Sequence, residues 1–282
     1  MARITLENIR KAFGKVQALD GISLDIKDNE FFVLFGPAGA GKTTILNCIA
    51  GITMPEEGTI SFNGEIMNLI DPAHRNVAMV FENYALFPQM TVYDNMASAL
   101  RSKLYREDEA VIKERIDKAA KMMKMEKLLE RLPSQLSNGQ KQRVAMGRAL
   151  VRTPNVFLMD EPLAHLDAKL RNSMRTELKE MQANLGSTCI YVTHDFMEAM
   201  ALGDRLAIIG CQVLFDKQEK HRHGMTKASV CEIDLRYHTM VILLRHRREG
   251  EMDSRIIRLG RIHNLLIQMI ILSQKGLGHC RG

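Results

Sequence analysis

The sequence has few cysteines, no long apolar run and, over its first three quarters, no excess of charge of either sign. The five cysteines are scattered without disulfide or metal-site spacing, which favours reduced thiols in the cytoplasm. No run of about 18 uninterrupted apolar residues occurs, so we expect no membrane span. Residues 1–5 lead directly into an alternating strand pattern, so we also expect no signal peptide.

The positive charge is confined to the C-terminal part of the chain. Residues 211–282 contain 13 Lys/Arg and 7 Asp/Glu, whereas residues 1–210 contain 26 of each. Six of the nine histidines and three of the five cysteines also follow residue 210. The overall net charge of +6 therefore belongs to this tail, and the main part of the chain gives no indication of nucleic-acid binding.

The most specific motif has the form G-x-x-x-x-G-K-[ST]. It follows an apolar strand-like run, 31–35, and leads into a helical pattern. Glycines let backbone N–H groups turn inward around a phosphate, and the helix adds the positive end of its dipole. The lysine can reach the β- and γ-phosphates, and the threonine hydroxyl can bind Mg²⁺. The motif predicts binding of a nucleoside triphosphate through Gly36, Pro37, Ala38, Gly39, Ala40, Gly41, Lys42, Thr43 and Thr44.

Short strand patterns alternate with helical ones along residues 1–210. Antiparallel strands are expected near the N-terminus, and buried strands at 77–81, 156–159, 189–193 and 205–209. Residues 91–152 read as helical. The sequence therefore predicts an α/β fold: a P-loop NTPase core with a mostly parallel sheet, an N-terminal antiparallel β subdomain and an inserted α-helical subdomain.

Three further motifs follow the P-loop along the chain. The apolar strand 156–159 ends in Asp160 and Glu161, which suit a Mg²⁺-organising carboxylate and a group that orients or deprotonates water. Ser137, at the start of a helix, is by itself an ordinary helix cap that can also hold an anion. His194 follows the strand 189–193.

Together these motifs resemble the ATP-binding-cassette (ABC) ATPase family. Residues 36–43 match its Walker A loop, 156–161 its Walker B strand, 136–140 its signature and 164–167 its D-loop. The resemblance covers about residues 1–215. Residues 84–92, 143–150 and 166–171 look like the carbohydrate-import branch, of the maltose and glycerol-phosphate type.

The resemblance implies a head-to-tail dimer, with itself or a homologous ABC ATPase, that sandwiches two ATP molecules. Catalytic roles fall to Glu161 and His194, and Mg²⁺ to Thr43, Asp160 and Glu82. Transmembrane permease subunits would dock on Tyr84–Val92, at the cytoplasmic face of the membrane. The implied nucleotide-binding residues beyond the P-loop are Phe13, Glu82, Ser137, Gly139, Gln140 and Asp167.

The chain departs from the family pattern at two site positions. Glu82 stands where the family has Gln; an ionised Glu only accepts hydrogen bonds and adds negative charge near the γ-phosphate. Asn138 replaces the first glycine of the signature, although Asn tolerates left-handed backbone better than most residues. We expect an importer subunit that hydrolyses ATP for uptake of a sugar or sugar-phosphate. The alternative is a non-transport regulator whose hydrolysis is impaired.

The sequence divides into an ABC nucleotide-binding domain, 1–215, with its helical subdomain at about 88–152, and a divergent basic tail, 216–282. The tail does not resemble the family's β-rich regulatory domain, and the sheet is expected to close by about residue 215. Three interpretations of the tail stay open: a poorly ordered extension, an altered reading frame, or a basic amphipathic membrane-surface helix at about 258–274.

Overall fold

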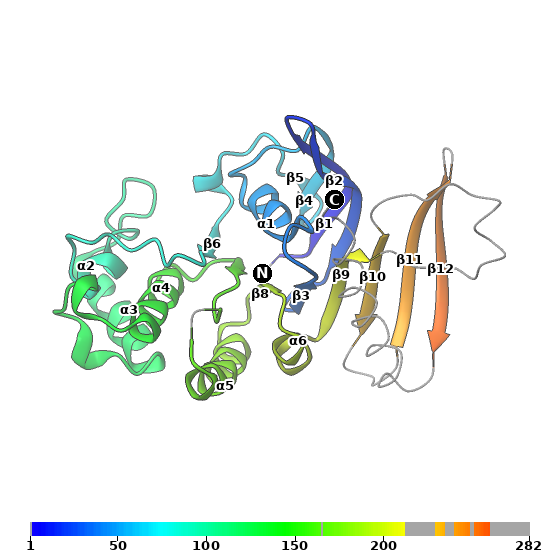
Figure 1. Ribbon diagram of the computed structural model, residues 1–282. Coiled ribbons are helices and arrows are strands. Elements are labelled where there is room, and N and C mark those ends of the chain that lie inside the picture. Colours follow the sequence, from blue (N-terminus) through cyan, green and yellow to red (C-terminus); the bar gives the residue numbers. More distant parts are fainter. Residues whose placement is uncertain (1, 165, 212–228, 235–239, 249–250, 260–282) are drawn as a thin grey trace.

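The computed structural model describes two sheets and the helices that cover them (Figure 1). The described residues are 2–164, 166–211, 229–234, 240–248 and 251–259. One sheet has four strands in the order β2-β1-β4-β5, and the other has eight in the order β12-β11-β10-β9-β3-β8-β7-β6. Among the described residues, no helix has both the length and the apolar character to cross a bilayer.

The four-stranded sheet is antiparallel and forms the N-terminal β subdomain. In β1, apolar and polar residues alternate, so that Ile4 and Leu6 are fully buried while Thr5 and Glu7 are more exposed. The strands are β1 (Ile4–Phe13), β2 (Val16–Ile26), β4 (Glu57–Phe62) and β5 (Glu65–Ile66).

Five neighbouring parallel strands form one side of the larger sheet, from β9 to the edge strand β6, as the alternation of strands and helices predicted. They are β3 (Phe31–Phe35), β6 (Val77–Val80), β7 (Val156–Asp160), β8 (Thr188–Thr193) and β9 (Arg205–Cys211). Every residue of β7 and β8 is buried, which is typical of a sheet covered on both faces.

The hydrophobic core has two parts, one on each face of this sheet, and helices contribute to both. Successive strand residues point to opposite faces, so Phe32 and Leu34 pack with α1 (Lys42–Ala50) and the antiparallel sheet. Phe31 and Val33 belong to the other cluster, which includes buried residues of α5 (Ala168–Leu185) and α6 (Phe196–Leu202). The carboxyl ends of β3, β7 and β8 therefore share one edge, where the loops to these helices begin.

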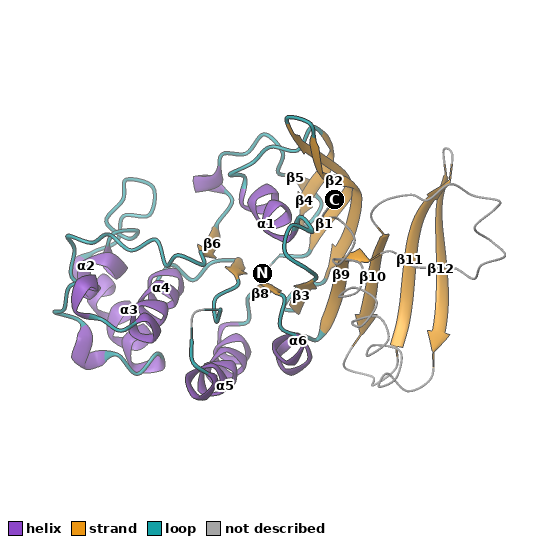
Figure 2. Ribbon diagram, in the orientation of Figure 1, coloured by secondary structure: helices purple, strands orange, loops and turns teal. Residues whose placement is uncertain are grey.

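The inserted helical subdomain lies between β6 and β7, and Figure 2 shows it as a group of helices beside the core sheet. Buried residues of α3 recur at helical spacing, such as Ile112 and Ile116. Its elements are α2 (Val92–Ala97), α3 (Glu109–Met122), α4 (Asn138–Leu150) and the short 3₁₀ turns η2 (Glu126–Leu128) and η3 (Pro133–Gln135); a further turn, η1 (Pro72–His74), precedes β6. The predicted fold class is confirmed.

The expectation that the sheet closes by about residue 215 is wrong. Three antiparallel strands extend it beyond β9: β10 (Ser229–Asp234), β11 (Met240–Arg248) and β12 (Glu251–Leu259). Without them β9 would be an edge strand with unpaired backbone groups, and β10 supplies their partners. Most of the membrane-surface helix expected at about 258–274 lies outside the described residues.

Candidate functional site

The P-loop connects β3 to α1 and owes its shape to glycine. Gly39 and Gly41 have φ of 78° and 92°, in the left-handed region that residues with a Cβ rarely adopt. A Cβ on Gly41 would also lie 2.6 Å from the carbonyl oxygen of Ala18 on β2. The chain thus turns tightly from the strand into α1, whose first helical residue is Lys42.

Lys42 folds back onto the loop that precedes it. Its side chain is 4% exposed, and Nζ donates hydrogen bonds to the carbonyl oxygens of Gly36 and Pro37, both at 2.9 Å. Nζ also lies 3.8 Å from Oε1 of Glu161. Burial lowers the pKa of Lys42, and the nearby carboxylates of Glu161 and Asp160 oppose that shift.

Thr43 and Asp160 join the start of α1 to the end of β7. The Thr43 hydroxyl donates a hydrogen bond of 3.1 Å to Oδ1 of Asp160. Burial raises the pKa of Asp160, and the charges of Glu161 and Glu82 act in the same direction. Two hard oxygen ligands, the Thr43 hydroxyl and the partly desolvated Asp160 carboxylate, therefore meet at this edge of the sheet.

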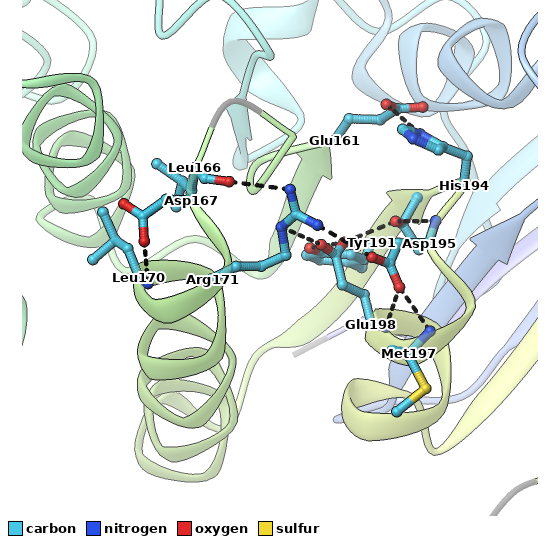
Figure 3. Close-up of polar contacts among 11 residues, drawn as sticks. Glu161, Leu166, Asp167, Leu170, Arg171, Tyr191, His194, Asp195, Met197 and Glu198 are labelled. Atoms are coloured by element: carbon cyan, nitrogen blue, oxygen red, sulfur yellow. Dashed lines mark hydrogen bonds and ion pairs between the residues drawn. The ribbon is translucent and has the colours of Figure 1, made fainter.

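Glu161 and His194 form a direct pair beside Lys42, drawn in Figure 3. Nδ1 of His194 lies 2.8 Å from Oε2 of Glu161. Glu161 has φ of 44°, a strained value for a residue with a Cβ. Its N–H donates to the carbonyl oxygen of Val192 at 3.1 Å, which holds the turn after β7 against the end of β8.

Glu82 and the segment Tyr84–Val92 connect β6 to the helical subdomain. Glu82 is exposed and close enough to influence Asp160 electrostatically. Asn95 of α2 donates to three carbonyl oxygens of residues 87–91 and accepts from the Phe87 N–H. Arg148 of α4 donates to the carbonyl oxygens of residues 84 and 85. The segment is thereby fastened to two helices of the subdomain.

The signature residues lie at the N-terminal end of α4, within the helical subdomain (Figure 1). Ser137 caps this helix: its Oγ accepts from the N–H of Gln140 at 3.3 Å, and the Gln140 side chain accepts from the Ser137 N–H at 3.0 Å. Gly139 is buried, and a Cβ there would overlap the side chain of Leu170. Asn138 is exposed and is accommodated as the first helical residue.

The remaining predicted site residues lie on separate elements. Phe13 ends β1 and is 52% exposed, with Nζ of Lys11 at 5.5 Å from its ring centre. Asp167 caps α5 by accepting from the N–H of Leu170 at 2.9 Å. Within one chain the structure thus brings together Lys42, Thr43, Asp160, Glu161 and His194, while Phe13 and the signature residues stand on other elements.

Four residues next to the site had no role assigned from the sequence: Arg171, Tyr191, Asp195 and Glu198. They form a polar network between α5, β8 and α6 (Figure 3). An Asp shortly after an expected strand and before a helical pattern is typical of a helix cap, so the sequence could have indicated the capping role of Asp195. The Arg171 contacts join distant segments, so no local pattern predicts them.

Comparison with known proteins places the chain in a family. The model of the ABC transporter family matches residues 19–164. An sn-glycerol-3-phosphate import ATP-binding protein, UgpC, of Brucella abortus is 52% identical over 210 residues, which cover 74% of this chain and 59% of the relative. The protein of the same name from Rhodopseudomonas palustris is 50% identical, over 74% and 58%. The chain thus spans about three-fifths of the length of the curated relatives it matches.

Solved structures agree with this assignment. A dimeric bacterial ABC transporter cassette, MJ0796, has a TM-score of 0.67 at 32% identity, over 73% of this chain and 94% of that one. The same cassette in a post-hydrolysis state with ADP and Pi matches equally well. None of these relatives supports the alternative of a non-transport regulator. The chain belongs to the ABC transporter family, whose ATPase domain it carries.

Proposed function

We propose that this chain binds ATP with Mg²⁺ and hydrolyses the ATP to drive an importer. The observation that carries the proposal is the contact between Glu161 and His194, at 2.8 Å, beside the P-loop lysine. A carboxylate and an imidazole next to a phosphate-binding loop are suited to activating water. The same edge supplies the backbone cradle and the oxygen ligands that a Mg²⁺-nucleotide requires.

Lys42 is the group that would hold the β- and γ-phosphates. Its ammonium now hydrogen-bonds to two loop carbonyls, which satisfy it only in part, and its burial penalises the charge. Phosphate oxygens are stronger, charged acceptors. We infer that Lys42 exchanges these carbonyls for phosphate, while the N–H groups of the loop and of the first turn of α1 bind the same anion.

Thr43 and Asp160 would hold the Mg²⁺. Their hydroxyl and carboxylate oxygens are the donors that Mg²⁺ prefers, and they already lie 3.1 Å apart. Burial, with a smaller contribution from neighbouring carboxylates, raises the pKa of Asp160, and a divalent cation would offset both effects. Glu82 would add a further negative group on this side. The bound cation would neutralise charge on the transferring phosphoryl group.

The wider assignment to a sugar or sugar-phosphate importer rests on the relatives and on the segment Tyr84–Val92. Residues of two helices fasten this segment, yet Phe87 at its centre is 43% exposed. A fastened segment with an exposed aromatic side chain suits a protein contact. We infer that permease subunits dock here, at the cytoplasmic face of the membrane, and that two ATPase chains close head to tail.

Replacing Glu161 with Gln tests the proposal. Glu161→Gln keeps the size of the side chain but removes the base, so ATP should still bind while turnover falls about 10²-fold or more. The matched control is Glu180→Gln, an exposed position on α5, which should retain the parent rate. Steady-state phosphate release and nucleotide affinity are measured on all three proteins. Turnover in Glu161→Gln at the parent rate would exclude Glu161 as the base.

A further inference from the structure

Arg171, in the first turn of α5, connects the loop after Glu161 to the loop that carries His194. One guanidinium nitrogen, Nη2, donates to the carbonyl oxygen of Leu166 at 3.1 Å, and Nη1 donates to Oδ2 of Asp195 at 3.4 Å. Figure 3 shows the side chain lying between these two acceptors. A single planar fork thus spans two segments that are far apart in the sequence.

On the His194 side, Arg171 contacts Asp195 directly, and Asp195 and Glu198 in turn hold Thr193, the other neighbour of the histidine. Oδ1 of Asp195 caps α6 by accepting from the N–H groups of Met197 and Glu198, at 2.7 and 3.1 Å. The hydroxyl of Thr193 accepts from the Asp195 N–H at 3.0 Å and donates to Glu198 at 2.8 Å. His194 therefore sits between two residues whose positions this network determines.

Glu198 gives the network a buried charge. It is 3% exposed, and its Oε2 accepts hydrogen bonds from Tyr191 and Thr193, each at 2.8 Å. Nε of Arg171 lies 3.7 Å from its other oxygen. A buried carboxylate needs such a cation nearby, so Arg171 has a structural role as well. An experiment on the functional role of Arg171 must therefore keep the positive charge beside Glu198.

The contacts close a ring around the two groups proposed to activate water. Glu161 pairs with His194; the chain continues from His194 to Asp195; Arg171 joins Asp195 to Leu166; and the backbone returns from Leu166 to Glu161. Within this ring, Arg171 is the bridge between the loop after β7 and the loop after β8. The pair itself and the hydrogen bond from the Glu161 N–H to the Val192 carbonyl oxygen also join the two loops here.

We propose that Arg171 is a positioning residue for ATP hydrolysis: by bridging Leu166 and Asp195, it holds His194 in line with Glu161. The inference rests on the proposed function of this site. Lysine cannot take the role, because its single ammonium has no planar fork and cannot serve both acceptors in the same geometry. It can still supply the positive charge beside Glu198.

Arg171→Lys in the full chain separates positioning from charge. We expect the melting temperature and the KM for ATP to stay close to those of the parent, because the charge beside Glu198 remains. Turnover should fall about tenfold or more, since a small misplacement of catalytic groups is costly. The matched control, Arg175→Lys, lies one turn farther along the same helix and should keep the parent turnover. Equal losses in both variants would overturn the proposal in favour of general charge pairing around Glu198.

Two measurements that do not depend on turnover accompany the kinetics. In Arg171→Lys, the amides of Asp195, Met197 and Glu198 should exchange faster with solvent, and the ¹⁵N resonances of the His194 ring should shift as its contact with Glu161 loosens. Arg175→Lys should change neither. Unaltered exchange, ring resonances and turnover in Arg171→Lys would overturn the proposal. A parent protein without Glu161-dependent turnover would refute the proposed function instead, and the exchange and ring data would still decide whether Arg171 holds the two loops.

Discussion

Two regions of the molecule satisfy their polar groups in different ways. One is the edge of the core sheet formed by the P-loop and the carboxyl ends of β7 and β8, called here the nucleotide edge, and the other is the N-terminal end of α4. At the edge, Lys42 and Glu161 from separate elements contact each other, and Thr43 contacts Asp160. At the end of α4, Ser137 and Gln140 only cap each other, and Ser137 stays exposed. One region is assembled within a single chain, whereas the other is a preformed helix terminus on the surface.

The difference indicates what each region requires to function. We propose that the nucleotide edge binds a Mg²⁺-nucleotide without a second chain, because its cradle, proposed cation ligands and proposed base already lie together. The end of α4 offers N–H groups and a hydroxyl to an anion but stands on the helical subdomain. We infer that it acts on nucleotide held by a second chain, so variants in the two regions should respond differently to protein concentration.

Loss of the P-loop lysine should have the largest effect. Lys42→Ala removes a buried cation from the phosphates, and losing one partner of a buried charged pair costs about 2–5 kcal/mol. We expect ATP affinity to fall about 10²-fold or more at every protein concentration, with the fold retained. Equilibrium binding of a fluorescent ATP analogue measures this, with Lys118→Ala on the exposed side of α3 as control. Unchanged affinity in a folded variant would contradict the P-loop assignment.

A charge at the signature serine should act only when two chains meet. Ser137→Asp keeps a good helix cap but places a negative charge where the partner's triphosphate would arrive. We expect unchanged stability and unchanged ATP affinity of the dilute chain, with turnover at high protein concentration lowered about tenfold or more. Asn63→Asp, which adds the same charge in an exposed turn of the antiparallel sheet and keeps the acceptor for the Arg3 N–H, is the control. Weakened ATP binding by the dilute Ser137→Asp chain would show that the serine acts within its own chain.

Restoring the family residue at position 82 should have a smaller effect of opposite sign. Glu82→Gln removes a negative charge that raises the pKa of Asp160, so Mg²⁺-ATP should be held in a better geometry. We expect Mg²⁺-dependent turnover to rise several-fold, most clearly with the membrane partner present. Steady-state ATPase assays across a range of Mg²⁺ concentrations measure it, with Glu126→Gln as control. Equal or slower turnover in the variant would refute a handicap from Glu82.

The sequence predicted the regions whose local motifs were specific, and it missed a contact between distant segments and the strands of the tail. The P-loop and the ends of β7 and β8 follow from apolar runs and short motifs, so the positions of Lys42, Asp160 and His194 at one edge of the sheet could be predicted, while their roles stay a prediction. Arg171 was missed because its role depends on Asp195, which lies 24 residues away and meets it only in the folded chain, although its other acceptor, Leu166, is local. The strands after residue 228 were missed because the composition of the tail outweighed a local hairpin signal, two runs separated by 249–250.

Removing the tail strands should have the smallest effect on the nucleotide edge. A chain ended after Lys217 loses β10–β12, so β9 loses one neighbour but keeps its parallel pairing with β3. Every proposed site residue lies at or before His194. We expect ATP affinity and turnover within about twofold of the parent, because distant sites without shared partners respond independently, and only a modest drop in melting temperature. Calorimetry with and without ATP, protease mapping of the full chain and phosphate-release assays measure these quantities. A large loss of melting temperature would mean that the added strands stabilise the core sheet. A loss of ATP affinity would mean that changes at β9 alter the P-loop, because Gly36 packs closely against Ile209 of β9.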